Sequence, residues 1–262
     1  MSERMKTPNT KHQTPDKHQA PNTNALGPFI VQQELSRRAL ALVFGVWILS
    51  GSWILDLGVS IVRAADTAKP LYQNDFFKGE VGKLPDEMLL LDGGFAVQEV
   101  NGDKVLQLPG APLETFGVLF GPTEGANIAV SARVHSTKKG RREPAFALGL
   151  NGNAGFKLQV SAAKKLLELY KGDDVVAKEP FAWESDSWTM LKLQIRKVKD
   201  GEFAVEGKAW KQGATEPDKW LVIYVEKTED GKEPTAGRAS IWGNPFAGTP
   251  IDFDDLVVSA VK

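Results

Sequence analysis

Paired carboxylates are the side chains of this sequence that come nearest to a catalytic pattern. Glycosidases hold two carboxyl groups about 5–5.5 Å or roughly 6.5–9.5 Å apart, on either side of the bond that they cut. The nearest match is Asp252-Phe253-Asp254, in which both carboxylates would lie on one face of a strand. Aspartates in such positions more often end a strand, cap a turn or hold a cation. The sequence therefore assigns no catalytic residue.

Other catalytic and zinc-binding groups are scarce. The chain has no cysteine and three histidines, of which only His135 lies beyond residue 64. A single histidine completes neither a catalytic triad nor a zinc site. The 32 basic and 33 acidic side chains nearly balance, so the composition shows no basic footprint for nucleic acid.

A second pair of carboxylates, Asp75 and Asp254, could hold a cation. Asp75 lies in the first expected strand and Asp254 in the last. If these strands are neighbours, the two carboxylates could share a Ca²⁺ with backbone carbonyls, because calcium takes six to eight oxygen ligands in flexible geometry. The alternative is two solvated aspartates. We expect no required cofactor and regard calcium as the candidate structural ion.

The elements that would position these residues are strands. From residue 71 onward the dominant hydropathy period is two. Four pairs of strand-like runs flank the turn sequences at 101–102, 151–155, 171–174 and 199–201, and further runs cover 128–134, 221–225, 238–242 and 251–261. The segment 161–169 contains helix-forming residues, but its neighbours favour a strand. Short strands with turns between them predict an all-β, two-sheet antiparallel jelly-roll sandwich over residues 66–262.

Alternation along the strands separates their residues into two faces. Side chains expected between the sheets are Ile128, Val130, Phe156, Leu158, Leu191, Leu193, Ile195, Phe203 and Val205. The opposite face would then carry Arg133, Lys157, Gln159, Lys192, Gln194, Arg196, Glu206, Lys208 and Trp210.

If these strands form one curved sheet, the polar set lines its concave side. Aromatic rings cover the apolar face of a sugar, and charged or amide groups bond its hydroxyls. The set therefore predicts a carbohydrate site, whereas the alternative is a solvated sheet face. Trp220 and Trp242 could lie near its rim, and we expect Trp188, at a strand entrance, to be buried.

Several segments resemble the concanavalin A-like lectins and glucanases. The hairpin of residues 188–210 is similar to their central hairpin, and residues 237–242 and 251–258 resemble the last two strands of laminin-G-like domains. The run of residues 72–77 resembles the first strand, which in this group pairs beside the last. A bacterial subset comprises the 3-keto-disaccharide hydrolases (domain of unknown function 1080). This chain lacks the Asn-Ser-Gly segment expected in that subset, and its absence argues against a hydrolase of this kind.

The N-terminal region differs from the rest of the chain. Residues 1–36 are rich in polar residues and proline, and their composition predicts a disordered tail. Arg37 and Arg38 precede an apolar run to Leu55, and Val62 and Ala64 fit a signal-peptidase site after Ala64. Residues 37–65 are therefore expected to be a signal peptide, with an uncleaved signal anchor as the alternative. Either predicts export to the periplasm, the cell surface or the medium.

The sequence thus favours an exported, non-catalytic module that binds an oligo- or polysaccharide. Two alternatives remain: a glycoside hydrolase with Glu206 or Asp254 among its acids, and a structural or protein-interaction domain of the laminin-G-like kind. Membrane contact is expected only through an uncleaved anchor.

Overall fold

The computed structural model of the protein describes residues 70–110, 114–229 and 232–261. The predicted tail (1–36) and the predicted signal peptide or anchor (37–65) lie outside these residues. Within the described part, no helix is both long and apolar enough to span a bilayer.

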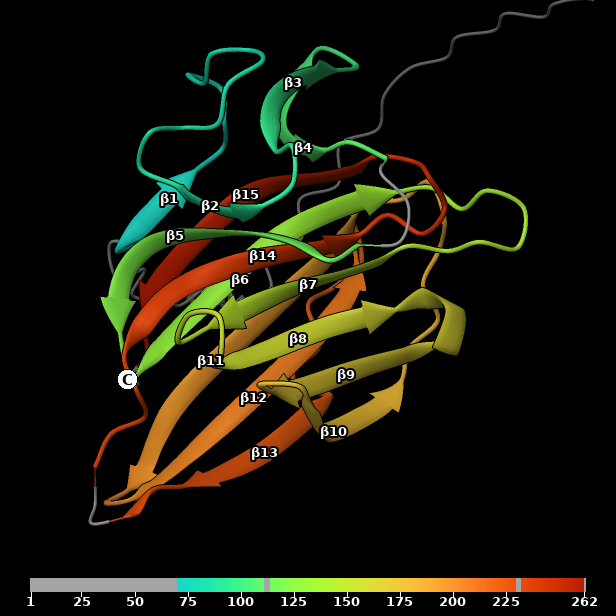
Figure 1. Cartoon of the computed structure of the whole chain (residues 1–262). Coiled ribbons are helices and arrows are strands. Elements are labelled where there is room, and N and C mark those ends of the chain that lie inside the picture. Colours follow the sequence, from blue (N-terminus) through green and yellow to red (C-terminus); the bar gives the residue numbers. More distant parts are fainter. Residues whose placement is uncertain (1–69, 111–113, 230–231, 262) are drawn as a thin grey trace, which may run out of the picture. The chain divides into compact units, whose positions relative to one another are not determined.

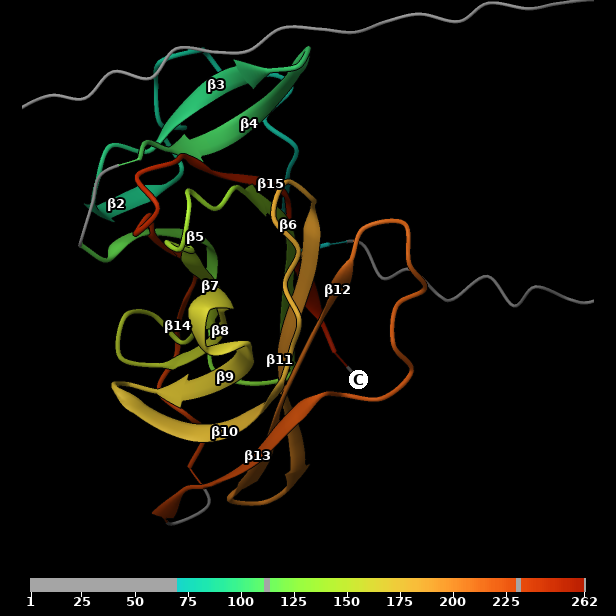
Figure 2. The same cartoon turned by 90° about the vertical axis from the view of Figure 1, so that its right-hand side faces the viewer.

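Two antiparallel sheets pack face to face (Figures 1 and 2). One has eight strands in the order β13-β12-β11-β6-β15-β4-β3, with β1 paired to β15, and the other has seven in the order β10-β9-β8-β7-β14-β5-β2. The eight-stranded sheet comprises β1 (Tyr72–Asn74), β3 (Ala96–Val100), β4 (Asp103–Leu108), β6 (Ile128–Ser136), β11 (Thr189–Lys199), β12 (Glu202–Lys211), β13 (Val222–Lys227) and β15 (Ile251–Ala260). The seven-stranded sheet comprises β2 (Leu89–Asp92), β5 (Phe116–Glu124), β7 (Ala145–Leu150), β8 (Phe156–Ser161), β9 (Leu166–Lys171), β10 (Asp174–Pro180) and β14 (Gly237–Asn244).

The four predicted hairpins are confirmed as β3–β4, β7–β8, β9–β10 and β11–β12. At the first turn, Asn101 and Gly102 have φ of 54° and 84°. Asn and Gly adopt this left-handed region at little cost, which explains why the pair marks a tight hairpin. The first strand pairs with the last, as expected, through β1 and β15.

Two strands escaped the sequence analysis. β2 and β5 form one edge of the seven-stranded sheet. Apolar and polar residues alternate little in their sequences, so the hydropathy pattern did not reveal them. The ambiguous segment 161–169 begins with a 3₁₀ turn, η1 (Ala162–Lys164), and continues as β9. Lys165 closes η1 with a φ of 56°, so the chain reverses into the strand instead of extending a helix.

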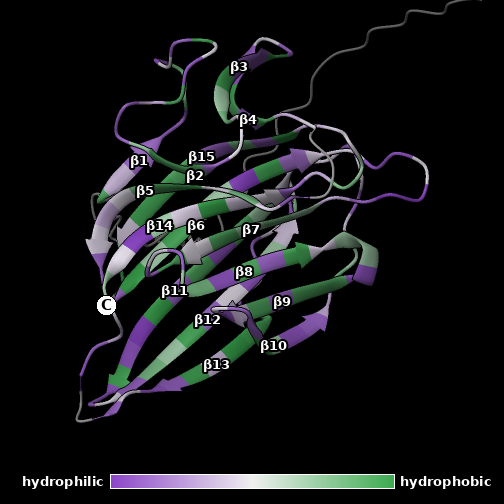
Figure 3. Ribbon diagram, viewed as in Figure 1, coloured by the Kyte–Doolittle hydropathy of each residue, from purple (hydrophilic) through white to green (hydrophobic). Residues whose placement is uncertain are grey.

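The core lies between the two sheets. All nine side chains expected there are buried, with exposed fractions of 4% or less. Figure 3 shows the alternation of apolar and polar residues along most strands. Each sheet therefore has one apolar face in the core and one polar face outside, and any ligand-binding surface on the strands lies on one of these two outer faces.

Candidate functional site

The nine predicted binding residues do not share one surface. Seven lie on the outer face of the eight-stranded sheet, whereas Lys157 and Gln159 belong to β8 and lie on the outer face of the seven-stranded sheet. The prediction that all nine line one curved sheet is therefore wrong. Alternation places a side chain inside or outside, but it does not tell which sheet a strand joins.

On the eight-stranded sheet, most of the predicted residues are covered and paired with one another. Lys208 is only 6% exposed, lies 2.7 Å from Glu216, and donates to the carbonyl of Pro217. Its Nζ also lies 4.6 Å from the ring centroid of Trp220 and 6.0 Å from that of Trp210. The segment between β12 and β13 thus covers this part of the sheet and neutralises its charge.

The neighbouring polar residues are also bonded within the sheet. Gln194 Nε2 donates to Glu206 Oε2 over 2.6 Å, and Arg196 lies 3.5 Å from the other Glu206 oxygen. Lys192 lies 3.0 Å from Glu216. Gln194 and Glu206 are both buried. Their polar groups are therefore already satisfied by protein partners.

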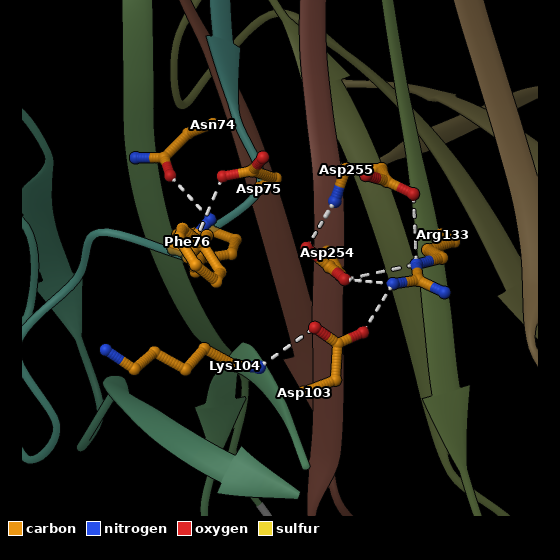
Figure 4. Close-up of polar contacts among 9 residues, drawn as sticks. Asn74, Asp75, Phe76, Asp103, Lys104, Arg133, Asp254 and Asp255 are labelled. Atoms are coloured by element: carbon orange, nitrogen blue, oxygen red, sulfur yellow. Dashed lines mark hydrogen bonds and ion pairs between the residues drawn. The ribbon is translucent and has the colours of Figure 1, made fainter. Parts of the chain in front are cut away.

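Arg133 lies further across the same face, among three aspartates (Figure 4). Its Nε donates to Asp254 over 3.1 Å and lies 3.0 Å from Asp255, and its Nη2 lies 2.9 Å from Asp103. The ring of Trp188 covers the guanidinium, with its centroid 4.5 Å from Cζ. The expectation that Trp188 is buried is wrong, because the residue is half-buried and its ring lies against this outer face.

The candidate calcium pair is engaged elsewhere. Asp254 binds Arg133 and accepts from the backbone N–H of Asp255, whereas the exposed Asp75 accepts from the backbone N–H of Phe77 (Figure 4). Among the described residues, no three histidine or acidic side chains form a group that could hold a metal ion. Both carboxylates thus have hydrogen-bond partners within the protein, and the calcium site stays a prediction.

Burial affects the titration of this cluster. It raises the pKa of Asp254 to about 6, against the opposing hydrogen bonds from Asp255 and Arg133. A hydrogen bond with Asp252 raises the pKa of His135, whose two ring nitrogens lie 3.3 Å from Asp252 and 3.2 Å from Asp186. A pocket of about 230 Å³ lies here, lined by residues that include His135, Trp188 and Asp103.

The outer face of the seven-stranded sheet has a different character. On β14, the ring of Trp242 lies flat across the sheet: a Cβ built on Gly117 of β5 would meet its six-membered ring at 2.6 Å. On the other side of β14, its Nε1 would lie 3.3 Å from a Cβ on Gly149 of β7 and donates to Ser240 over 2.8 Å. The two glycines leave room for the ring, and the hydrogen bond fixes its orientation.

Lys157 and Tyr170 lie beside this ring. The Lys157 Nζ is 5.5 Å from the Trp242 ring centroid and 5.0 Å from that of Tyr170. Gln159 is the next outward residue of β8 and donates to Ser161 over 2.9 Å. We call this surface, made of Trp242, Lys157, Gln159 and Tyr170, the Trp242 face.

A pocket of about 340 Å³ opens on the Trp242 face. Its lining includes Lys157, Gln159, Tyr170, Asn244 and the partly exposed Phe246. The pocket therefore combines two aromatic side chains with two lysines, two amides and one acid, Glu143.

The buried acid Glu168 is bonded to three residues that line the pocket. Glu168 accepts from Ser161 over 2.5 Å, from Lys164 over 3.1 Å and from Tyr170 over 3.2 Å. Burial acts to raise the pKa of Glu168, but the hydrogen bonds from Ser161 and Lys164 hold it below its ordinary value. Glu168 is therefore a charged group that orients Tyr170.

The sequence analysis named three of the four residues of this surface. Lys157 and Gln159 were among the predicted binding residues, and Trp242 was placed near the rim of the predicted site. Tyr170 and the adjacent Glu168 were not singled out. One usable signal was present: the two strands that flank β14 each have a glycine next to the ring of Trp242, Gly117 in β5 and Gly149 in β7. Glycine at such a position often marks a close approach by another group.

Comparison with known proteins supports the fold. A protein of unknown function with a galectin-like fold from Bacillus subtilis matches with a TM-score of 0.51 at 12% identity, over 74% of this chain and 98% of that chain. The carbohydrate-binding module CBM66 from Bacillus subtilis gives 0.46 at 13% identity, over 66% and 96%. A xylan beta-1,4-xylosidase from Bacillus halodurans gives 0.49 at 15% identity, over 73% of this chain but only 39% of the xylosidase.

The first of these similarities shows that the chain has a galectin-like jelly roll, and the two weaker ones add nothing to that. No protein-family model matches the chain, and no curated protein matches it significantly. The resemblance to the 3-keto-disaccharide hydrolases is therefore not confirmed.

Proposed function

We propose that this protein binds carbohydrate, and that the Trp242 face is the binding surface. The observation that carries the proposal is the flat, fixed ring of Trp242 over Gly117. The ring stays partly exposed, with the Lys157 ammonium over it, so a ligand that contacts the ring also meets Lys157. Pyranose rings present C–H groups that pack on such a surface, and the indole is already oriented, so little conformational entropy is lost on binding.

The surrounding groups match the hydroxyls of a sugar. Lys157 donates, and Gln159 both donates and accepts, from one strand next to the ring. The hydroxyl of Tyr170 is held by Glu168. Aromatic area beside a few placed polar groups is the usual composition of a small-ligand site.

A non-catalytic role is part of the proposal. The hydrolase alternative has Glu206 or Asp254 among its acids. Glu206 is bonded to Gln194 and lies 3.5 Å from Arg196, and Asp254 is bonded to Arg133, so each carboxylate is held by protein donors. Glu168, the buried acid of the Trp242 face, is fully engaged with three donors.

Export is also proposed. It rests on the apolar run after Arg37 and Arg38 and on the small residues Val62 and Ala64. Expression of the full chain in a bacterium with a secretion system would test it. We expect a mature protein that begins after Ala64, measured by mass spectrometry of the extracytoplasmic fraction, whereas an intact cytoplasmic chain would contradict the proposal.

Glycan-array screening of the full chain tests carbohydrate binding. We expect retention on a defined set of glycans, and Trp242→Ala should weaken the affinity at least about tenfold, as for loss of a central aromatic contact. Trp220→Ala is the matched control, because Trp220 lies against Lys208 on the outer face of the eight-stranded sheet. Equal retention of both variants, or no retention at all, would sink the proposal. A parallel screen with chelator tests the calcium prediction.

A further inference from the structure

Lys157 differs from its neighbouring lysines because it has no acidic partner. Lys164 lies 3.1 Å from Glu168, and Lys171 lies 2.7 Å from Glu226. Among the described residues, no carboxylate lies within ion-pair distance of Lys157, whose Nζ contacts only the two aromatic rings. A cation is therefore held on the proposed binding surface without a counterion.

The surroundings of Lys157 make an anionic partner favourable. The side chain is half-buried, and this burial lowers the pKa of its ammonium, with Asp173 acting weakly in the opposite sense. Removing a charge from water without a partner is unfavourable. An acidic group on a ligand would offset that cost, whereas a neutral ligand would add to it by displacing water.

A second cluster of unpaired cations adjoins the same pocket. The loop between β6 and β7 contains Lys138, Lys139, Arg141 and Arg142, all exposed, and none of them makes an ion pair within the described part of the chain. Gly140, with a φ of 62°, turns the loop, and the backbones of Lys139 and Arg142 bond to each other in both directions. The loop therefore presents four cations on a formed hairpin.

The loop and the pocket are continuous along the chain. Glu143 and Pro144 follow Arg142 directly, and both line the pocket that contains Lys157. Glu143 is the single acid between the loop cations and β7. Short runs rich in Lys and Arg commonly bind sulfated polysaccharides or nucleic acids. Here the run continues into a pocket that contains aromatic side chains and the half-buried Lys157, which favours a saccharide.

We propose that the ligand of the Trp242 face is an acidic polysaccharide, which rests on the proposed function above. A carboxylate or sulfate of one sugar unit pairs with Lys157 while that unit packs on Trp242. Further acidic units along the same polymer contact the cations of the β6–β7 loop.

Affinity measurements on the full chain test this inference. The probes are polygalacturonate (carboxylated), heparin (sulfated), dextran and xylan (neutral), and single-stranded oligo(dT). We expect binding to one of the two acidic polysaccharides that weakens as salt increases, because ion pairing contributes. Which of the two binds identifies the acidic group.

Two variants assign the binding to the proposed cations. Lys157→Met keeps the apolar stem and should lower affinity for the acidic polysaccharide at least tenfold, and replacement of the four loop cations by Gln should lower it further and flatten the salt dependence. Lys211→Met is the control, because Lys211 pairs with Glu184 at the end of β12. Thermal unfolding should show that Lys157→Met folds normally.

The outcomes separate the two proposals. Retention of dextran or xylan that depends on Trp242 but not on Lys157 would overturn the acidic-ligand inference and leave carbohydrate binding intact. Binding of oligo(dT) as tightly as heparin, unaffected by Trp242→Ala, would overturn the inference in favour of a general polyanion surface on the loop. No binding to any saccharide would overturn both.

Discussion

The outer faces of the two sheets carry similar kinds of residues but differ in how those residues are paired. On the eight-stranded sheet, Arg133, Lys208 and Glu206 are all bonded to protein groups and covered by Trp188 or by the segment after β12. On the seven-stranded sheet, Lys157 has no acidic partner and lines an open pocket, and the ring of Trp242 lies beside Lys157.

This difference separates a structural polar surface from a binding surface. A bonded cluster gains nothing from a ligand unless the ligand replaces what it already has. An unpaired cation and a fixed aromatic ring can still gain contacts. The pairing of polar groups is therefore more informative about function than their number.

The largest expected effect comes from breaking the central ion pair on the outer face of the eight-stranded sheet, which we call the paired face. Arg133→Met removes the main partner of Asp254, which is only 1% exposed. Breaking such a buried pair typically costs about 3–5 kcal/mol in free energy of unfolding, measured by urea denaturation. The double variant Arg133→Met with Asp254→Leu should recover much of this loss. A loss under about 1 kcal/mol in the single variant would show that this face is not held by its ion pairs.

The next largest effect concerns the Trp242 face. Gly117→Val places a branched side chain where the ring of Trp242 now lies, at 2.6 Å from the built Cβ. We expect the ring to be displaced and glycan affinity to fall about tenfold, equivalent to roughly 1.4 kcal/mol, with the fold retained by circular dichroism. Ser259→Val is the control, because it places the same side chain in β15 of the eight-stranded sheet, away from Trp242. Unchanged affinity in Gly117→Val would mean that the flat ring is not the platform.

A smaller effect should appear in the pH dependence of the paired face. The hydrogen bond with Asp252 raises the pKa of His135 in the folded protein above its ordinary 6.5. The folded state therefore binds the proton more tightly, and this stabilisation is complete below pH 6.5 and is lost as the pH rises through the folded pKa. His135→Gln should flatten the decline in free energy of unfolding above pH 6.5.

Asp254 provides an internal reference for that experiment. Its pKa is raised to about 6 from 3.8, so stability also falls as the pH rises through that lower window. The decline between pH 4 and 6 should persist in His135→Gln. If both declines disappear together, the two groups titrate as one unit and their separate assignment is wrong.

The smallest effect is expected at the rim of the paired face. Lys192 and Glu216 are partly exposed and lie 3.0 Å apart. Lys192→Gln should change the free energy of unfolding by no more than about 1 kcal/mol and leave glycan retention unchanged, because Glu216 keeps its ion pair with Lys208. Loss of retention in this variant would return the binding site to the eight-stranded sheet.

The sequence predicted the fold and the inward side of each strand well. Residues such as Leu191, Leu193 and Ile195 alternate with polar neighbours, and all three are fully buried. This works because the period of a strand is two and only one face of each sheet meets the core. The turn residues at 101–102 and 199–201 likewise predict their hairpins locally.

The site could be predicted only in part, because it depends on which strands are neighbours. Lys157 and Arg133 are both outward residues, but β8 and β6 join different sheets. Trp242 and Gly117 are far apart in the sequence and become neighbours through the pairing of β14 with β5. Such long-range pairing leaves no local pattern, and β5 itself was not predicted.

The pairing of β1 with β15 fixes how the domain can be attached to other parts of a molecule. The chain enters β1 at Tyr72 and leaves β15 at Ala260, and both strands belong to the eight-stranded sheet (Figure 1). A tether at either end therefore departs from the layer that does not carry Trp242. The domain can be anchored to a carrier at both ends and still present its aromatic surface outward.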